Sequence, residues 1–204
     1  MNSTIDYYNN NAEEYYEQTV NVCFQELYYR FLKFIPEGGR IMDAGCGSGR
    51  DAAAFCRLGY RAEGIDASEK LADLARKNHG ISVSVCSIED DWTAAEPFDG
   101  IWCCAVLLHL TDRQITRFFA NLRYNLRPGG TLFISVKTGI ETGYDDKGRY
   151  MRNFTESDIR TFIEKANISG TGPEIKEIWY TEDSTGRDVR WMNVIARMDG
   201  VNVY

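Results

Sequence analysis

The sequence predicts an α/β fold, in which a mostly parallel β-sheet is covered by α-helices on both faces. Segments with strand and helix periodicity alternate between residues 40 and 137, which is the pattern of consecutive β–α–β units. Residues 100–104 are almost continuously apolar, as expected for a strand that is buried on both faces. A glycine-rich turn joins the first predicted strand to the helix that follows it.

The predicted elements follow one another without a repeat, a low-complexity tract or a linker that would mark a domain boundary. Apolar and aromatic residues at three- and four-residue spacing predict helical structure over residues 4–34. Strands are predicted at residues 40–43, 61–65, 81–86, 100–104 and 131–137. The intervening helices are predicted at residues 50–58, 68–79 and 112–125. Ser68 should cap the second of these helices, and residues 127–130 should close the third.

The last third of the chain departs from this alternation. Residues 155–166 are predicted to form a helix, which opens with the capping-box-like sequence Thr155-Glu-Ser-Asp158. Residues 175–181 and 190–197 are predicted strands joined by a glycine-containing turn. We therefore expect the sheet to end in an antiparallel hairpin.

Composition narrows the class of protein. The 204 residues suit one domain, and 44% hydrophobic residues are normal for a globular protein. The net charge of -7 weighs against binding to nucleic acid, which requires clustered Lys and Arg, although a local basic groove is compatible with it. The six cysteines and two histidines lack the close spacing of zinc ligands, so no metal site is predicted. With neither a signal peptide nor a long apolar stretch in the sequence, we expect a cytoplasmic protein without membrane contact.

The turn after the first strand reads Asp43-Ala-Gly45-Cys46-Gly47-Ser-Gly49-Arg50. Glycines allow a tight turn and let a ligand approach the backbone closely. Dinucleotide-binding folds use GxGxxG, which would place a third glycine where this chain has Arg50. The GxGxG spacing therefore disfavours a nicotinamide-dependent oxidoreductase.

The second strand ends at Asp66, about 20 residues after the first glycine of the turn. A carboxylate at this distance is placed to accept hydrogen bonds from both hydroxyls of an adenosine ribose. An acid at the start of the next helix is the structural alternative for Asp66.

The glycine turn, Asp43, Asp66 and the terminal hairpin together resemble the class I S-adenosylmethionine-dependent methyltransferases. The resemblance rests on motifs over residues 38–136 and on the order of the predicted elements in the rest of the chain. The resemblance implies a Rossmann-like sheet of seven strands in the order 3-2-1-4-5-7-6, with strand 7 antiparallel. It also implies one domain over residues 1–204. Within it we expect an N-terminal helical lid (1–36), a cofactor-binding core (37–137), a substrate loop (138–154) and a C-terminal helix with a β-hairpin (155–204).

The same resemblance implies S-adenosylmethionine as cofactor and S-adenosylhomocysteine as product. The methionine part would lie near Asp43 and the turn, and the ribose would lie at Asp66. The adenine would lie after the third strand, where either Glu89 or Asp90 could reach its amine. The implied cofactor-binding residues are Asp43, Gly45, Cys46, Gly47, Gly49, Asp66, Ala67, Ile88, Glu89 and Cys103.

The segment after the fourth strand reads Cys103-Cys-Ala-Val-Leu-Leu-His109. It lacks the Asp/Asn-Pro-Pro-aromatic motif with which amino-group methylases of nucleic acid position a base. The Leu-Leu-His arrangement is similar to that of small-molecule methyltransferases. Arg50-Asp51 after the glycines resembles the tellurite-resistance and thiopurine-type members.

His109 is the candidate general base, because it follows the fourth strand on the ligand side of the sheet, and packing is the alternative role. Tyr8 and Tyr16 belong to a tyrosine cluster that is predicted to cover the site and contact substrate, or else to pack as an ordinary amphipathic helix. Lys137, Arg149 and Tyr150 flank or lie in a long glycine-punctuated loop, where they are predicted to recognise an anionic group of the acceptor. A solvated surface hairpin is the alternative for this loop. Arg187, Arg190 and Trp191 could reach the same opening.

Three functions fit these residues. The first is transfer of a methyl group to a small-molecule acceptor by in-line displacement, which mainly needs alignment and exclusion of water. The second is an RNA methyltransferase acting on tRNA. The third is a non-catalytic module that binds S-adenosylmethionine. The sequence predicts a monomer or homodimer, and it does not specify the acceptor.

Overall fold

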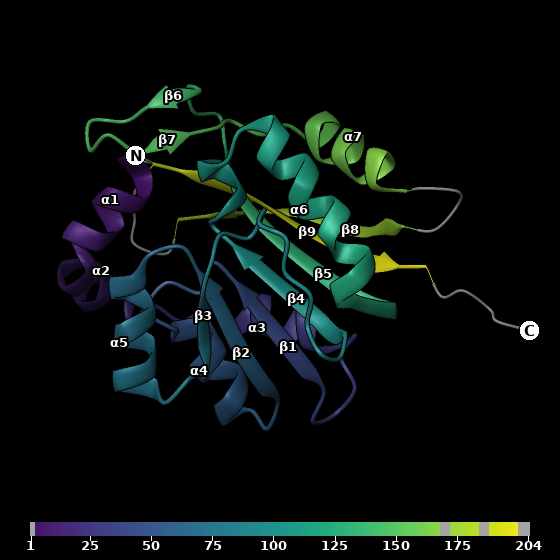
Figure 1. Cartoon of the computed structure of the whole chain (residues 1–204). Coiled ribbons are helices and arrows are strands. Elements are labelled where there is room, and N and C mark those ends of the chain that lie inside the picture. Colours follow the sequence, from purple (N-terminus) through teal and green to yellow (C-terminus); the bar gives the residue numbers. More distant parts are fainter. Residues whose placement is uncertain (1–2, 168–171, 184–187, 200–204) are drawn as a thin grey trace, which may run out of the picture.

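The computed structural model describes residues 3–167, 172–183 and 188–199. A seven-stranded sheet in the order β3-β2-β1-β4-β5-β9-β8 forms its centre, and a separate two-stranded sheet contains β6 and β7 (Figure 1). The large sheet contains β1 (Arg40–Ala44), β2 (Arg61–Asp66), β3 (Val83–Val85), β4 (Phe98–Cys104), β5 (Leu126–Thr138), β8 (Pro173–Glu182) and β9 (Arg190–Met198). The small sheet contains β6 (Gly143–Tyr144) and β7 (Tyr150–Met151).

The predicted fold class and strand order are confirmed. Because β6 and β7 stand apart, β8 and β9 are the sixth and seventh strands of the large sheet. The pairs β1–β2, β1–β4, β2–β3 and β4–β5 are parallel. The pairs β5–β9 and β8–β9 are antiparallel, so β9 is the reversed strand.

Helices cover both faces of the sheet. They are α1 (Ser3–Asn10), α2 (Ala12–Thr19), α3 (Gln25–Leu32), α4 (Arg50–Arg57), α5 (Glu69–His79), α6 (Asp112–Asn125) and α7 (Glu156–Ala166), with a 3₁₀ turn, η1 (Leu107–His109), after β4. Alternate residues of each central strand enter different cores. Ile101 and Cys103 pack with α6 and α7, whereas Trp102 packs with α3 and α4 and stacks on Phe133 at a centroid distance of 3.8 Å.

Two predicted helix starts are confirmed by their caps. The Ser68 hydroxyl accepts a hydrogen bond from the Leu71 N–H at 3.2 Å. Thr155 and Asp158 form a reciprocal capping box at the start of α7. Such caps satisfy backbone donors that have no partner within the helix.

Two predicted segments have different bounds in the structure. The segment predicted as helical over residues 4–34 contains three helices, because the chain turns at Asn11 and again over residues 20–24. Strand β5 begins at Leu126 rather than at residue 131, because Leu126 pairs in parallel with Phe98 and extends the ladder backwards.

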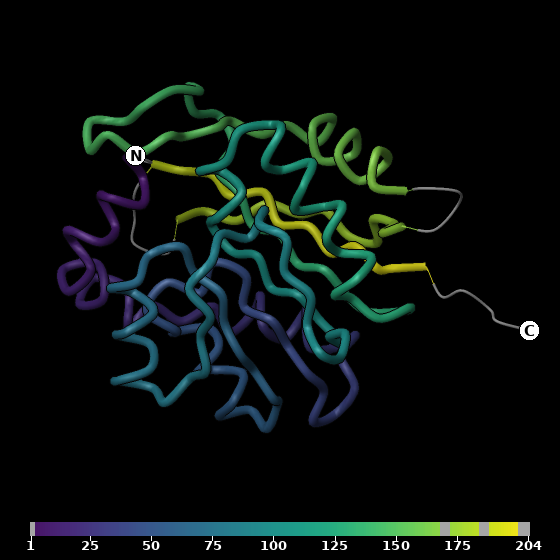
Figure 2. The backbone as a smooth tube through the Cα atoms, in the orientation of Figure 1, coloured from purple at the N-terminus to yellow at the C-terminus, as the bar shows by residue number. Residues whose placement is uncertain are grey.

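The N-terminal helices and the β6–β7 hairpin lie together at the edge of the sheet where the parallel strands end. Helices α1 and α2 pack on α5 through Ala12, Leu71 and Leu74. The Tyr150 N–H donates to the hydroxyl of Thr4 at 2.9 Å, which joins the hairpin to α1. Figure 2 shows this green hairpin directly beside the purple N-terminal trace. In the described part of the chain, no helix has the length and apolar character that crossing a bilayer requires.

Candidate active site

Two adjoining cavities lie at the carboxyl ends of the parallel strands. The larger has a volume of about 750 Å³ and the smaller about 110 Å³. The residues bordering both include Tyr8, Tyr15, Gly45, Gly47, Cys104 and His109. Crevices at this edge of an open α/β sheet are the usual ligand sites of such folds. The two cavities therefore form one candidate site with two compartments.

The glycine turn after β1 separates the compartments. Gly45 has a φ of 75°, and a Cβ built on it would lie inside van der Waals contact of the Val106 side chain. The N–H groups of Gly45 and Cys46 donate to the Ile65 carbonyl at 2.8 and 3.0 Å. Glycine is therefore required at this left-handed position, where the Val106 side chain fills the space that a Cβ would take.

Asp66 joins the turn to the smaller cavity. Its carboxylate accepts hydrogen bonds from the N–H groups of Gly47 at 2.7 Å and Ser68 at 2.8 Å. Burial raises the pKa of Asp66, and these two donors offset part of that rise. Ala67 and Ile88 line the same cavity. Three residues predicted for the adenosine side of the site thus lie in one compartment.

Asp43 lies at the larger cavity with only 2% of its surface exposed. Its carboxylate accepts a hydrogen bond from the Ala52 N–H in α4 at 3.0 Å. Burial, together with the neighbouring carboxylate of Asp51, raises the pKa of Asp43 well above its ordinary value. A cationic group bound beside Asp43 would stabilise its ionised form.

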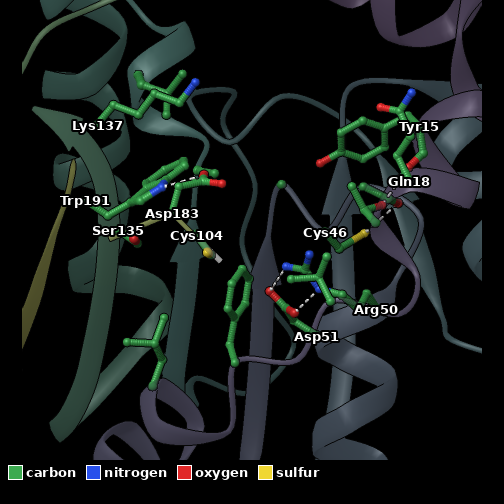
Figure 3. Close-up of a pocket in the computed structure, with 18 of the residues that line it drawn as sticks. Tyr15, Gln18, Cys46, Arg50, Asp51, Cys104, Ser135, Lys137, Asp183 and Trp191 are labelled. Atoms are coloured by element: carbon green, nitrogen blue, oxygen red, sulfur yellow. Dashed lines mark hydrogen bonds and ion pairs between the residues drawn. The ribbon is translucent and has the colours of Figure 1, made fainter. Parts of the chain in front are cut away.

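A buried ion pair forms one wall of the larger cavity. Arg50 Nε lies 2.6 Å from Asp51 Oδ1, and the Asp51 carboxylate also accepts bonds from Tyr28 Oη at 2.6 Å and Trp102 Nε1 at 2.9 Å. Burial alone would raise the pKa of Asp51, but Arg50 and these two donors lower it below its usual range. The Arg50 guanidinium lies 4.4 Å above the Phe24 ring. Figure 3 shows this pair on one side of the pocket.

The opposite wall comes from β5, β9 and the end of β8. Trp191 Nε1 donates to Asp183 at 3.1 Å, and the Lys137 ammonium lies 5.6 Å from the Trp191 ring centroid (Figure 3). Lys137 and Trp191 both line the larger cavity. Arg190 lies instead over the Tyr180 ring at 4.0 Å, and Arg187 is outside the described residues.

The β6–β7 hairpin closes the far end of this cavity. Arg149 lines it, together with Lys147 and Met151. The Arg149 Nη2 donates to Asp145 at 2.7 Å, and its Nη1 lies 3.4 Å from the Tyr8 hydroxyl. Tyr150 contributes its backbone, since its carbonyl oxygen lies 2.8 Å from His109 Nδ1.

His109 lies under this hairpin and beside α1. Its Nε2 is 2.9 Å from the hydroxyl of Tyr8, and the two rings meet edge to face at a centroid distance of 5.5 Å. Burial, followed by the positive charges of Arg149 and Lys137, lowers the pKa of His109 to about 4. The imidazole is therefore neutral near pH 7, with both nitrogens engaged.

Several predicted site residues lie outside the two cavity linings. Gly49 starts α4 and packs against Ala75, Cys103 is fully buried in the core, and Tyr16 packs against the His79 ring. Glu89 accepts hydrogen bonds from Gln114 and Ser87. Cys104, one residue after the predicted Cys103, borders both cavities, because successive residues of a strand face opposite sides of the sheet.

The sequence comparison agrees with this geometry. Residues 41–130 match the model of a family described as a methyltransferase domain, and they contain the glycine turn, Asp66 and η1. Over this region the chain is thus similar to methyltransferases. Solved structures that share this fold include complexes with S-adenosylmethionine and with S-adenosylhomocysteine, the cofactor and product that the resemblance implies.

Curated relatives of this chain include two ubiquinone biosynthesis O-methyltransferases. The protein from Xanthomonas axonopodis pv. citri is 37% identical over 119 residues, which are 54% of this chain and 48% of the relative. The protein from Coxiella burnetii is 36% identical over 116 residues, 52% of this chain and 48% of the relative. The chain thus spans about half the length of the curated relatives it matches.

Solved methyltransferases share the fold. A 1,6-didemethyltoxoflavin-N1-methyltransferase from Burkholderia thailandensis superposes with a TM-score of 0.74 at 20% identity, over 96% of this chain and 85% of that one. A TehB-like methyltransferase from Corynebacterium glutamicum superposes with a TM-score of 0.73 at 18% identity, over 93% and 99% of the two chains. At these identities the likeness concerns the architecture alone.

The sequence did not point to some residues that line the two cavities. Tyr15 borders both compartments, and Ser48 and Arg50 line the larger one. The signal for Tyr15 was present, since it belongs to the predicted tyrosine cluster one residue from Tyr16. Asp183 had no signal, because only the pairing of β8 with β9 places it beside Trp191.

Proposed function

We propose that this protein transfers a methyl group from S-adenosylmethionine to a hydroxyl group of a small aromatic acceptor. The observation that carries the proposal is the pair of compartments meeting at the Gly45–Gly47 turn. The small compartment, with Asp66 at its wall, has the donor and acceptor chemistry for a ribose. The large compartment leaves room for a second molecule beside the cofactor.

The residues present fit the cofactor. Asp43 and the turn suit the cationic amino-acid end, and Asp66, Ala67 and Ile88 suit the nucleoside. When bound, S-adenosylmethionine supplies an activated methyl group, and the protein contributes alignment and exclusion of water. Tyr8 and Tyr15, from α1 and α2, form part of the walls of the site. These two helices are proposed to act as a lid over the core at residues 37–137, whereas α3 packs with α4 against Trp102 in that core.

The acceptor is proposed to lie between the aromatic wall and the cationic end of the large cavity. Trp191, Tyr7 and Tyr8 offer ring surfaces, while Lys137 and Arg149 offer positive charge. This arrangement suits a planar molecule with an anionic substituent. The names of the curated relatives specify O-methylation, which supports oxygen as the acceptor atom.

Calorimetric titration tests the cofactor assignment. We expect S-adenosylmethionine and S-adenosylhomocysteine to bind with micromolar affinity, NAD to show no binding, and Asp66→Ala to weaken binding at least tenfold. The Asp91→Ala variant is the matched control, because the Asp91 side chain is 92% exposed. Folded protein that binds neither sulfur nucleotide would contradict the proposal.

A transfer assay with methyl-labelled S-adenosylmethionine tests the acceptor class. The panel should hold hydroxybenzoates, catechols, aromatic amines and transfer RNA. Label on a hydroxylated aromatic supports the proposal. Label on RNA alone would favour the RNA methyltransferase, and cofactor binding without transfer to any acceptor would favour a binding module.

A further inference from the structure

The contacts of His109 define where its proton lies. A carbonyl oxygen accepts hydrogen bonds and cannot donate them, so the Tyr150 carbonyl at 2.8 Å requires the proton to be on Nδ1. A neutral imidazole carries one ring proton, which leaves Nε2 as an acceptor. The Tyr8 hydroxyl at 2.9 Å is then the donor to Nε2.

Burial is the main cause of the lowered pKa of His109, and the charged groups around the ring modify it. From the β6–β7 hairpin, Arg149 disfavours the imidazolium and Asp145 favours it; from β5, Lys137 also disfavours it. Burial acts in the same direction as the two cations, and the resulting pKa is about 4. His109 is therefore an unprotonated acceptor over the physiological pH range.

Because Tyr8 occupies Nε2, His109 has no ring nitrogen left for direct contact with an acceptor molecule. Tyr8, like His109, borders both compartments of the site. Its oxygen donates to His109, and Arg149 Nη1 lies 3.4 Å from the same oxygen. A hydroxyl group on a bound acceptor could donate to a remaining lone pair of the Tyr8 oxygen.

We propose that Tyr8, held by His109, is the catalytic residue that takes the proton from the acceptor hydroxyl. This inference rests on the proposed methyl transfer to oxygen. The role of general base, which the sequence assigned to His109 alone, then belongs to a relay that begins at Tyr8 in α1.

The relay conserves atoms and charge. As the acceptor oxygen bonds to the methyl carbon and the carbon–sulfur bond breaks, the hydroxyl proton passes to the Tyr8 oxygen. The original Tyr8 proton passes to His109 Nε2, which becomes an imidazolium, and it later leaves to solvent. Arg149 stabilises negative charge that develops on the Tyr8 oxygen during the exchange.

Nitrogen-15 NMR of the imidazoles tests the geometry without any acceptor. The chain has only two histidines, so a His79→Gln variant assigns both sets of resonances. We expect His109 to be neutral with its proton on Nδ1 from pH 5.5 to 8, with or without S-adenosylhomocysteine. Tyr8→Phe should shift the Nε2 resonance. A proton on Nε2 of the neutral ring would overturn the relay.

Two acceptors that differ in ionisation test the proton step. 4-Hydroxybenzoate must lose a proton, whereas the thiol of 4-mercaptobenzoate is already ionised near pH 8 and needs no base. We expect Tyr8→Phe and His109→Asn each to lower kcat for the hydroxyl compound about 100-fold, the usual lower scale of general-base catalysis. The rate with the thiol should change less than threefold, and the double variant should be no slower than either single variant.

Tyr124→Phe, on the outer surface of α6, is the control and should leave both rates unchanged. Equal losses with the hydroxyl and thiol acceptors would indicate a structural role and overturn the relay, as would no loss with either. Wild-type protein that methylates nothing in the panel would overturn the proposed function and the relay with it. Transfer that survives Tyr8→Phe undiminished would overturn the relay alone.

Discussion

The carboxylate of Asp66 accepts a hydrogen bond from the Gly47 N–H at 2.7 Å, so the end of β2 holds the glycine turn that follows β1. One side chain therefore shapes the turn and also borders the smaller cavity. Because parallel neighbours place their carboxyl ends side by side, two motifs distant in sequence act as one unit.

This contact predicts a pH dependence of cofactor binding. Burial raises the pKa of Asp66, so its carboxylate is protonated at a higher pH than an exposed aspartate. Affinity for S-adenosylhomocysteine should fall as the pH drops through that raised pKa, because the neutral acid is a poorer acceptor. Calorimetry from pH 7.5 to 4.5 measures this, with Asp66→Asn expected to bind weakly and with a smaller pH dependence. Identical pH dependence in the variant would contradict the assignment.

The Gly45→Ala substitution should lower cofactor affinity more than tenfold. The new methyl group would overlap Val106, and the φ of 75° is strained for alanine. Gly59→Ala is the matched control, because its φ is 90° but nothing lies within 4 Å of its Cβ position. The control should cost about 1 kcal/mol of stability and leave affinity unchanged. Similar affinity in both variants would show that the turn does not approach the ligand.

Removing the acid of the buried ion pair should destabilise the fold. Asp51→Ala leaves the Arg50 guanidinium without its bidentate partner and removes the acceptor of Tyr28 and Trp102. We expect a loss of about 3–5 kcal/mol in the free energy of unfolding, measured by urea denaturation. Asp91→Ala, which removes an exposed pair with Arg117, should change it by less than about 0.5 kcal/mol. Comparable losses would mean that solvent screens the Arg50–Asp51 pair.

His109 should make folding stability depend on pH. Its pKa is about 4 in the folded protein and about 6.5 in an unfolded chain, so the unfolded state binds more protons below pH 6.5. Stability should therefore decrease as the pH falls from 6.5 to 4, by up to about 3 kcal/mol from this group. Subtracting the curve of His109→Asn from that of the wild type isolates this dependence. Parallel curves would show that His109 titrates normally.

Arg149 should contribute to recognition of anionic acceptors. Arg149→Met should raise KM about tenfold for a carboxylated hydroxybenzene and much less for its uncharged analogue, since a charge-assisted hydrogen bond is lost only with the former. Arg160→Met is the control, because the Arg160 side chain lies on the surface of α7 at 53% exposure. A uniform rise in KM for both acceptors would indicate loss of cavity shape.

The strands, most helices and both caps were predictable, because they follow from local periodicity and from short side-chain-to-backbone contacts. The predicted start of β5 was wrong at Leu126, because its pairing with Phe98 depends on a distant strand and not on neighbouring residues. The turn glycines and Asp66 were predictable through spacing. The prediction named Cys103, whereas Cys104, one position later, lines the cavity. The sequence shows that strand residues alternate between two faces, but it does not show which face meets the cavity.

The sequence by itself determined the α/β class and the glycine turn, because each depends on residues close together in the chain. Only the tertiary structure decided the orientation of His109, since the Tyr150 carbonyl and the Tyr8 hydroxyl come from segments 41 and 101 residues away. The same holds for Asp183 beside Trp191, which strand pairing brings together. Long-range contacts of this kind arise from packing of complete elements, and they set the chemistry of the site.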